Sequence, residues 1–232
     1  MVLSLRKELL QKSIFLIVSL AIGALFGGAL IHLIPEAFEK IENSALVSLL
    51  IISGILSFLV LEKFLMWHHC HGHGSNEDHT GDNIKPLGFL VIISDGIHNL
   101  VDGIIIGASY LISIEVGIAA TIAVILHEIP QEISDFGLLI HAGFTKMKAL
   151  AINFATALLA IVGVGIAFVL GGNSEIFTPA VLAFAAGGFI YIAGSDLVPE
   201  IHKISDLKRS SLQLFMILVG IGLMFALLLL EI

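Results

Sequence analysis

The sequence predicts an all-α fold, a polytopic bundle of membrane helices, and three observations carry this prediction. Hydrophobic residues make up 57% of the 232 residues and charged residues only 13%, about half the charged share of a typical soluble chain. The mean hydropathy of +1.04 agrees with this composition. The apolar runs are continuous, whereas the strands of a membrane barrel alternate with a period of two.

Seven stretches are long enough to cross a bilayer, whose apolar core of about 30 Å needs about 20 residues of helix. They cover residues 14–34, 46–66, 87–111, 116–142, 149–171, 178–199 and 211–230. The connections are short except 67–86, a polar segment rich in Gly and His that we expect to be unstructured. The basic lead has no convincing small-residue cleavage site, so we expect a retained helix and not a signal peptide. The whole chain, 1–232, is predicted to be one transmembrane domain.

Basic residues fall almost entirely on one side of these seven spans. Ten of the 11 Lys and Arg residues lie on the side of the N-terminus, and only Lys40 lies on the other. Because Lys and Arg concentrate in cytoplasmic connections, we expect the N-terminus and the 67–86 loop in the cytoplasm. The C-terminus is then outside. The same count supports an odd number of helices, because a missed helix in mid-chain would distribute the Lys and Arg residues over both sides of the membrane.

The third and fourth predicted spans carry polar side chains that ordinary membrane helices avoid. These are Asp95, His98, Asn99, Asp102, His127, Glu128, Gln131, Glu132 and Asp135. No Lys or Arg lies in these two spans, and an ionised group at mid-bilayer costs at least about 2.5 kcal/mol. A cation that binds and leaves is therefore the natural partner. The simpler alternative, polar groups that only hydrogen-bond between helices, fits one isolated His better than nine groups.

Residue spacing places these groups together. His98 and Asp102 are four residues apart, hence on one helix face, and so are His127 and Gln131. Both histidines lie about 15 Å into their spans, near the midplane. Pro130 lacks an amide hydrogen and frees a backbone carbonyl one turn earlier. Imidazole, carboxylate and amide ligands without a thiolate suit Zn²⁺, with Fe²⁺, Mn²⁺ or Cd²⁺ as alternatives.

Two of these motifs resemble the paired signatures of the ZIP family of divalent-metal transporters. HNLVDG (98–103) and HEIPQE (127–132) are close to the family's HNxxDG and HExPHE. Elsewhere, HLIPE (32–36), LEKFL (61–65) and DLVPE (196–200) resemble further family segments. The resemblance implies a fold of membrane helices and a two-metal transport site. That site would be lined by His98, Asn99, Asp102, His127, Glu128 and Gln131.

Three departures from the family pattern stand out. The family usually has eight helices, and this chain is expected to lack the first. Gln131 stands where close relatives carry a second His, and an amide is a weaker ligand for zinc. Gly28 stands where many relatives place an acidic residue, so metal capture at the outer mouth would depend more on His32 and Glu36.

Other metal-binding groups are predicted outside the two central spans. His32 and Glu36 suit an outer opening, and Asp196, Glu200 and His202 suit an inner one, with solvated surface groups as the alternative for both sets. The loop could bind metal by its composition, although a passive polar linker is the alternative because no fixed ligand spacing is visible. Its candidate ligands are His68, His69, Cys70, His71, His73 and His79.

A short internal repeat is also visible. HLIPE ends the first span and DLVPE the sixth, and opposed copies of one unit recur in transporters. A match of five residues can also arise by chance. The glycine pairs 27–28, 171–172 and 187–188 are expected to allow close helix packing.

The function predicted from these observations is import of Zn²⁺, or a similar divalent metal, into the cytoplasm. Two alternatives are an intramembrane zinc protease, for which Gln131 breaks the HExxH ligand set, and a membrane metal sensor without transport. The expected partners are divalent metal ions, the lipid bilayer and, as a further hypothesis, a second copy in a homodimer. The net charge of −8 excludes nucleic acid as a partner. A prokaryotic inner membrane is the expected location.

Overall fold

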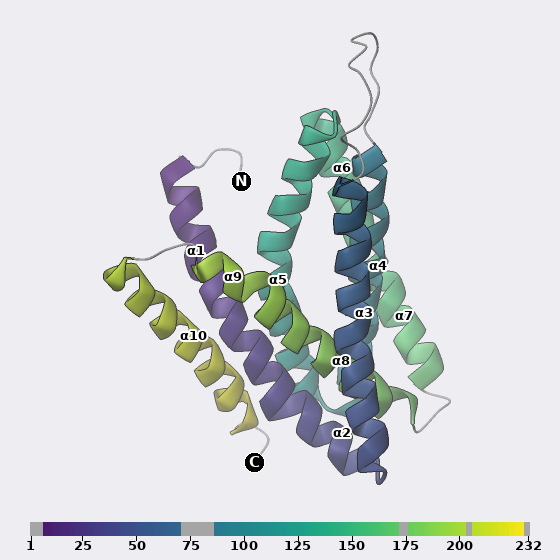
Figure 1. Cartoon of the computed structure of the whole chain (residues 1–232). Helices are drawn as coiled ribbons and strands as arrows, with labels where there is room; N and C mark the ends of the chain where they lie inside the picture. Colours follow the sequence, from purple (N-terminus) through teal and green to yellow (C-terminus); the bar gives the residue numbers. More distant parts are fainter. Residues whose placement is uncertain (1–6, 71–85, 172–175, 203–205, 230–232) are drawn as a thin grey trace.

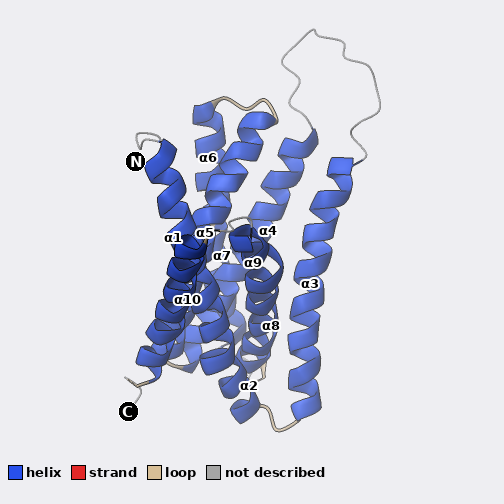
Figure 2. Cartoon of the chain, turned by 60° about the vertical axis from the view of Figure 1, so that its left-hand side comes forward, coloured by secondary structure: helices blue, strands red, loops and turns tan. Residues whose placement is uncertain are grey.

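The computed structural model describes residues 7–70, 86–171, 176–202 and 206–229 of the chain. Every element in these residues is helical, and seven helical segments are long and apolar enough to cross a membrane. The segments stand side by side in one bundle (Figures 1 and 2). Each of the seven predicted spans overlaps one of them. The predicted all-α bundle with seven spans is therefore confirmed.

The long helices follow one another through the chain with short connections between most of them. They are α1 (Lys7–Gly27), α3 (Ser44–Cys70), α4 (Pro86–Ile112), α5 (Ile114–His141), α6 (Lys146–Ala157), α7 (Leu159–Gly171), α8 (Phe177–Tyr191) and α10 (Leu207–Leu228). Two shorter helices, α2 (Ile34–Lys40) and α9 (Val198–His202), extend α1 and α8. Polar caps begin several helices, as where the Ser113 hydroxyl accepts a hydrogen bond from the Val116 amide at the start of α5.

Two of the predicted boundaries differ from the structure. The predicted loop 67–86 is shorter, because α3 continues as helix to Cys70 and α4 begins at Pro86. Proline suits the first turn of a helix, where its missing amide hydrogen has no partner to lose. The predicted span 149–171 is interrupted at Leu158, between α6 and α7. The Thr156 hydroxyl donates back to the carbonyls of Ile152 and Asn153 just before this break, and such back-bonding bends helices.

The two short motifs of the internal repeat adopt the same unusual backbone. A six-residue π-helical segment, η2 (Gly28–Leu33), joins α1 to α2, and another, η3 (Ile192–Leu197), joins α8 to α9. Each is followed within two residues by a Pro-Glu pair. The two units run in opposite directions in Figure 1, and η2 packs against α8 while η3 packs against α1. The two copies therefore share the same backbone form, run in opposite directions, and each contacts the long helix of the other.

Glycine permits the closest helix crossings of the bundle. At the crossing of α4 and α7, a Cβ atom on Gly103 would lie 2.0 Å from the Ala160 carbonyl oxygen, and one on Gly163 would lie 2.2 Å from that of Leu100. Equivalent reciprocal pairs hold α1 against α10 and α3 against α8. They are Gly23 with Gly220 and Gly54 with Gly187. Of the glycine pairs predicted to pack closely, 187–188 does so, and so do Gly27 against Met224 and Gly171 against Leu111. A Cβ atom on Gly28 would make only ordinary contacts, and residue 172 lies outside the described part of the chain.

Candidate metal centre

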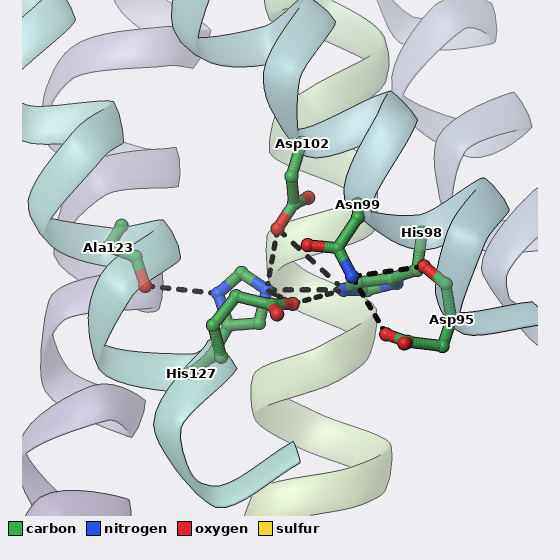
Figure 3. Close-up of polar contacts among 7 residues, drawn as sticks. Asp95, His98, Asn99, Asp102, Ala123 and His127 are labelled. Carbon is green, nitrogen blue, oxygen red and sulfur yellow. Dashed lines mark hydrogen bonds and ion pairs between the residues drawn. The ribbon is translucent and has the colours of Figure 1, made fainter. Parts of the chain in front are cut away.

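Helices α4 and α5 pack against each other and bring four metal-binding side chains to one point inside the bundle. His98 and Asp102 come from one face of α4, four residues apart. His127 and Glu128 come from the middle of α5, three and two residues before Pro130. Figure 3 shows the imidazoles of His98 and His127 and the carboxylate of Asp102 converging between the two helices. We call these four residues the central cluster: His98, Asp102, His127 and Glu128.

The ligand atoms of the central cluster are closely and evenly spaced. His98 Nε2 lies 3.3 Å from His127 Nε2 and 3.3 Å from Glu128 Oε1. His127 Nε2 lies 3.1 Å from Asp102 Oδ2 and 3.7 Å from Glu128 Oε1. The remaining measured edge, from His98 Nε2 to Asp102 Oδ2, is 3.7 Å. All four atoms therefore surround a space of the size of one ion.

A hydrogen bond at the back of His127 orients its ring toward the cluster. Nδ1 of His127 donates to the carbonyl oxygen of Ala123 at 3.0 Å (Figure 3). Because a carbonyl only accepts, the proton of the neutral ring lies on Nδ1, and Nε2 presents its lone pair to the other ligands. Metal-binding histidines are commonly held in this way by a partner on the second nitrogen.

Among the described residues, no Lys or Arg pairs with the buried carboxylate oxygens of the central cluster. Asp102 is 1% exposed, and both of its oxygens, together with Glu128 Oε1, have no hydrogen-bond partner among the described residues. Within the same part of the chain, the residues at ion-pair distance from these two carboxylates are the histidines of the cluster. Buried carboxylates need a pairing charge or a metal. The arrangement thus suits a cation with nitrogen and oxygen ligands.

A second group of oxygen ligands adjoins the first. Asp95, Glu128 and Glu132 also place one carboxylate oxygen each within 4.8 Å of the others, so Glu128 belongs to both groups. Asn99 donates to Asp95 Oδ1 at 2.7 Å and to its backbone carbonyl at 3.1 Å. We call Asp95, Glu128 and Glu132 the carboxylate cluster. It adds Asp95 and Glu132 to the candidate ligands predicted from the sequence. Their spacing, Asp95 three residues before His98 and Glu132 four after Glu128, could have indicated both.

The six ligands predicted in the two central spans differ in their positions and contacts. Four form the central cluster. Asn99 is buried beside it and binds Asp95 through its amide nitrogen. Gln131 is half-buried on α5, one turn beyond His127, and its contact with a metal stays a prediction.

The structure describes contacts for both residues that are predicted at the outer opening. His32 lies in η2, is 3% exposed, and places Nε2 2.8 Å from the carbonyl oxygen of Met224 on α10. Glu36 instead pairs with Lys40 at 3.5 Å. The Nε2 atom of His32 therefore bonds to a backbone carbonyl of another helix, and metal binding by this residue stays a prediction.

The remaining predicted ligands lie at the opposite end of the bundle or outside the described residues. His202 is exposed at the end of α9. Asp196 falls in η3 and Glu200 in α9, with side chains outside the described part. His68 and His69 belong to the helical end of α3, again without described side chains, while His71, His73 and His79 lie in the segment 71–85 that the structure does not describe.

A bundle of membrane helices around a cluster of nitrogen and oxygen ligands for a cation is the architecture of a membrane metal transporter. The comparisons with known proteins agree. The family profile described as ZIP Zinc transporter matches residues 1–86 and 67–228. The chain belongs to the ZIP zinc transporter family, whose members are multi-pass membrane transporters and not enzymes. This finding disfavours the protease alternative.

Individual relatives match along most of the chain. Zinc transporter YKE4 of Saccharomyces cerevisiae is 35% identical over 241 residues, which cover 90% of this chain and 69% of that protein. Zinc transporter ZIP13 of Pongo abelii is 33% identical over 90% of this chain and 65% of its own length. Metal cation symporter ZIP14 of Xenopus tropicalis is 30% identical over 87% of this chain and 57% of its own length. The chain thus spans about two thirds, or less, of the length of these relatives.

Proposed function

We propose that this chain carries Zn²⁺ across a membrane into the cytoplasm, with the central cluster as its binding site. The observation that carries the proposal is the spacing of the four ligand atoms. Zinc prefers a tetrahedron of nitrogen and oxygen ligands at about 2.0–2.2 Å, whose edges are about 3.3–3.6 Å. The five measured edges range from 3.1 to 3.7 Å. A zinc ion would fit among these atoms with little rearrangement.

The carboxylate cluster gives the ion a second position. Glu128 is shared by both clusters, so an ion can exchange one ligand at a time as it moves between them. Asp95 lies closer than His98 to the N-terminal end of α4, where the 71–85 segment joins. We place this end in the cytoplasm because ten of the 11 Lys and Arg residues lie on that side of the predicted spans. Inward movement then runs from the central to the carboxylate cluster.

Transport assays with two variants test this proposal. Asp102→Ala and Glu128→Ala each remove a carboxylate that has no basic partner among the described residues, and each should abolish uptake of radioactive zinc into vesicles. Glu115→Ala is the matched control, since Glu115 is a half-buried carboxylate in the first turn of the same helix and belongs to neither cluster, and it should transport normally. Near-normal uptake by both cluster variants, at equal amounts in the membrane, would reject the site. Absence of any uptake by the unmodified protein would favour the metal sensor.

Three finer predictions rest on sequence alone. They are a homodimer, a prokaryotic inner membrane as the location, and metal binding by the histidine-rich segment. The named relatives come from a yeast and two vertebrates, so they do not support a prokaryotic location.

A further inference from the structure

Four aromatic rings form a continuous row through the central cluster. Phe58 of α3 contacts the His98 ring with centroids 5.6 Å apart and planes at 86°. His98 contacts His127 in the same way, at 5.5 Å and 87°. His127 in turn contacts Phe189 of α8 at 6.0 Å and 64°. The two metal-binding imidazoles therefore lie between two phenylalanine rings, each in a T-shaped contact of the favourable kind.

Both phenylalanines are themselves held firmly. Phe189 is fully buried and Phe58 is 7% exposed. They come from α3 and α8, which cross at the glycine contact of Gly54 with Gly187. The Phe58 ring also lies directly against Gly188, where a Cβ atom would come within 2.5 Å of it. The rings thus form rigid walls behind the two imidazoles.

The two histidines depend on these walls to different degrees. His127 is also oriented by its Nδ1 hydrogen bond to Ala123. For His98, no hydrogen bond of Nδ1 to the described residues is found. Its Nε2 atom contacts only other members of the central cluster, with His127 Nε2 and Glu128 Oε1 each at 3.3 Å. On the side away from the other ligands, the His98 ring is therefore positioned by its contact with Phe58.

We propose that Phe58, and to a smaller extent Phe189, position the imidazoles so that the cluster keeps the size of zinc and disfavours larger divalent cations such as Cd²⁺. The inference rests on the proposed function of the cluster. Without the Phe58 ring, His98 can turn away from the other ligands, and the space between them widens. The cluster then loses affinity for zinc, which needs short bonds, whereas its affinity for a larger cation falls only a little.

The test is metal binding by the full chain in lipid nanodiscs, measured by titration with Zn²⁺ and separately with Cd²⁺. A T-shaped contact is worth about 0.5–1.5 kcal/mol, so Phe58→Leu should weaken zinc binding about two- to twelvefold. Cadmium binding should stay within about twofold, which lowers the zinc-to-cadmium affinity ratio. Phe189→Leu should lower that ratio less, because His127 retains its hydrogen bond.

Phe26→Leu is the matched control. Phe26 packs against the same core and has no ring contact with either histidine among the described residues. It should lower thermal stability much as the other variants do and leave the affinity ratio unchanged. An unchanged ratio in Phe58→Leu, or an equal change in Phe26→Leu, would overturn the inference. Failure of the unmodified protein to bind zinc, or zinc binding that survives Asp102→Ala, would instead reject the proposed function itself.

Discussion

The glycine crossing of α4 and α7 permits a sharp test, because two glycines on the same helix differ in their surroundings. A Cβ atom on Gly163 would lie 2.2 Å from the Leu100 carbonyl oxygen, whereas one on Gly165 would meet nothing within 4 Å. Ordinary contact begins near 3.4 Å, so Gly163→Ala must separate the two helices by about 1 Å. Overpacking of this kind costs about 1–3 kcal/mol. Alanine recovers at most about 1 kcal/mol of helix propensity.

The net expectation is therefore that Gly163→Ala destabilises the protein by up to about 2 kcal/mol, while Gly165→Ala is neutral or slightly stabilising. The first change should also impair metal binding, because Leu100 lies on α4 between His98 and Asp102. Binding sites need their ligands held within about 0.5 Å. We expect zinc affinity to fall about tenfold or more in Gly163→Ala and to be unchanged in Gly165→Ala.

Thermal unfolding of the purified protein in nanodiscs, followed by zinc titration, checks both parts. The two alanine variants add the same atoms to the same helix, so a general effect of alanine on α7 would appear in both. Equal stability and equal zinc affinity of the two variants would refute the reasoning that the close crossing positions the ligands.

Three further predictions follow from other parts of the chain. Gln131→His adds a stronger zinc ligand than an amide and should tighten zinc binding in titrations while slowing uptake; unchanged affinity would mean that residue 131 does not touch the metal. Deletion of 68–82 should leave the initial rate of zinc uptake nearly intact but weaken its decline as internal zinc accumulates, and an initial rate cut tenfold or more would place this segment in the transport path. His32→Ala should lower stability by about 1–3 kcal/mol in thermal unfolding, because it leaves the buried Met224 carbonyl without its donor. Zinc affinity of the central cluster should be unchanged in the same variant, and a tenfold loss would show that His32 acts in binding.

The spans and the central cluster could be predicted because local rules govern both. Apolar length identifies membrane helices, and the spacing of four residues places His98 and Asp102 on one face. The absence of Lys and Arg from the two central spans indicated that the cluster needs a cation. The structure adds the contact between α4 and α5 that joins the two faces into one cluster.

The features that escaped prediction depend on residues far apart in the chain. The hydrogen bond of His32 to the Met224 carbonyl joins residues 192 positions apart. The T-shaped contacts of Phe58 and Phe189 with the two histidines likewise depend on how α3 and α8 pack against the centre. The pattern of residues along one helix does not predict such contacts with distant helices.

The two π-helical segments change how the surfaces of α1 and α8 must be mapped. A π turn contains one residue more than an α turn, and one added residue rotates everything beyond it by about 100°. A helical wheel drawn unbroken through 15–40 or 177–202 therefore assigns the residues after η2 and η3 to the wrong face. Removing a single residue from either segment would restore a regular α-helix and turn its Pro-Glu pair to another side of the bundle. A change of one residue in the length of either segment would thus rotate the end of the helix, with little change in how far the helix extends.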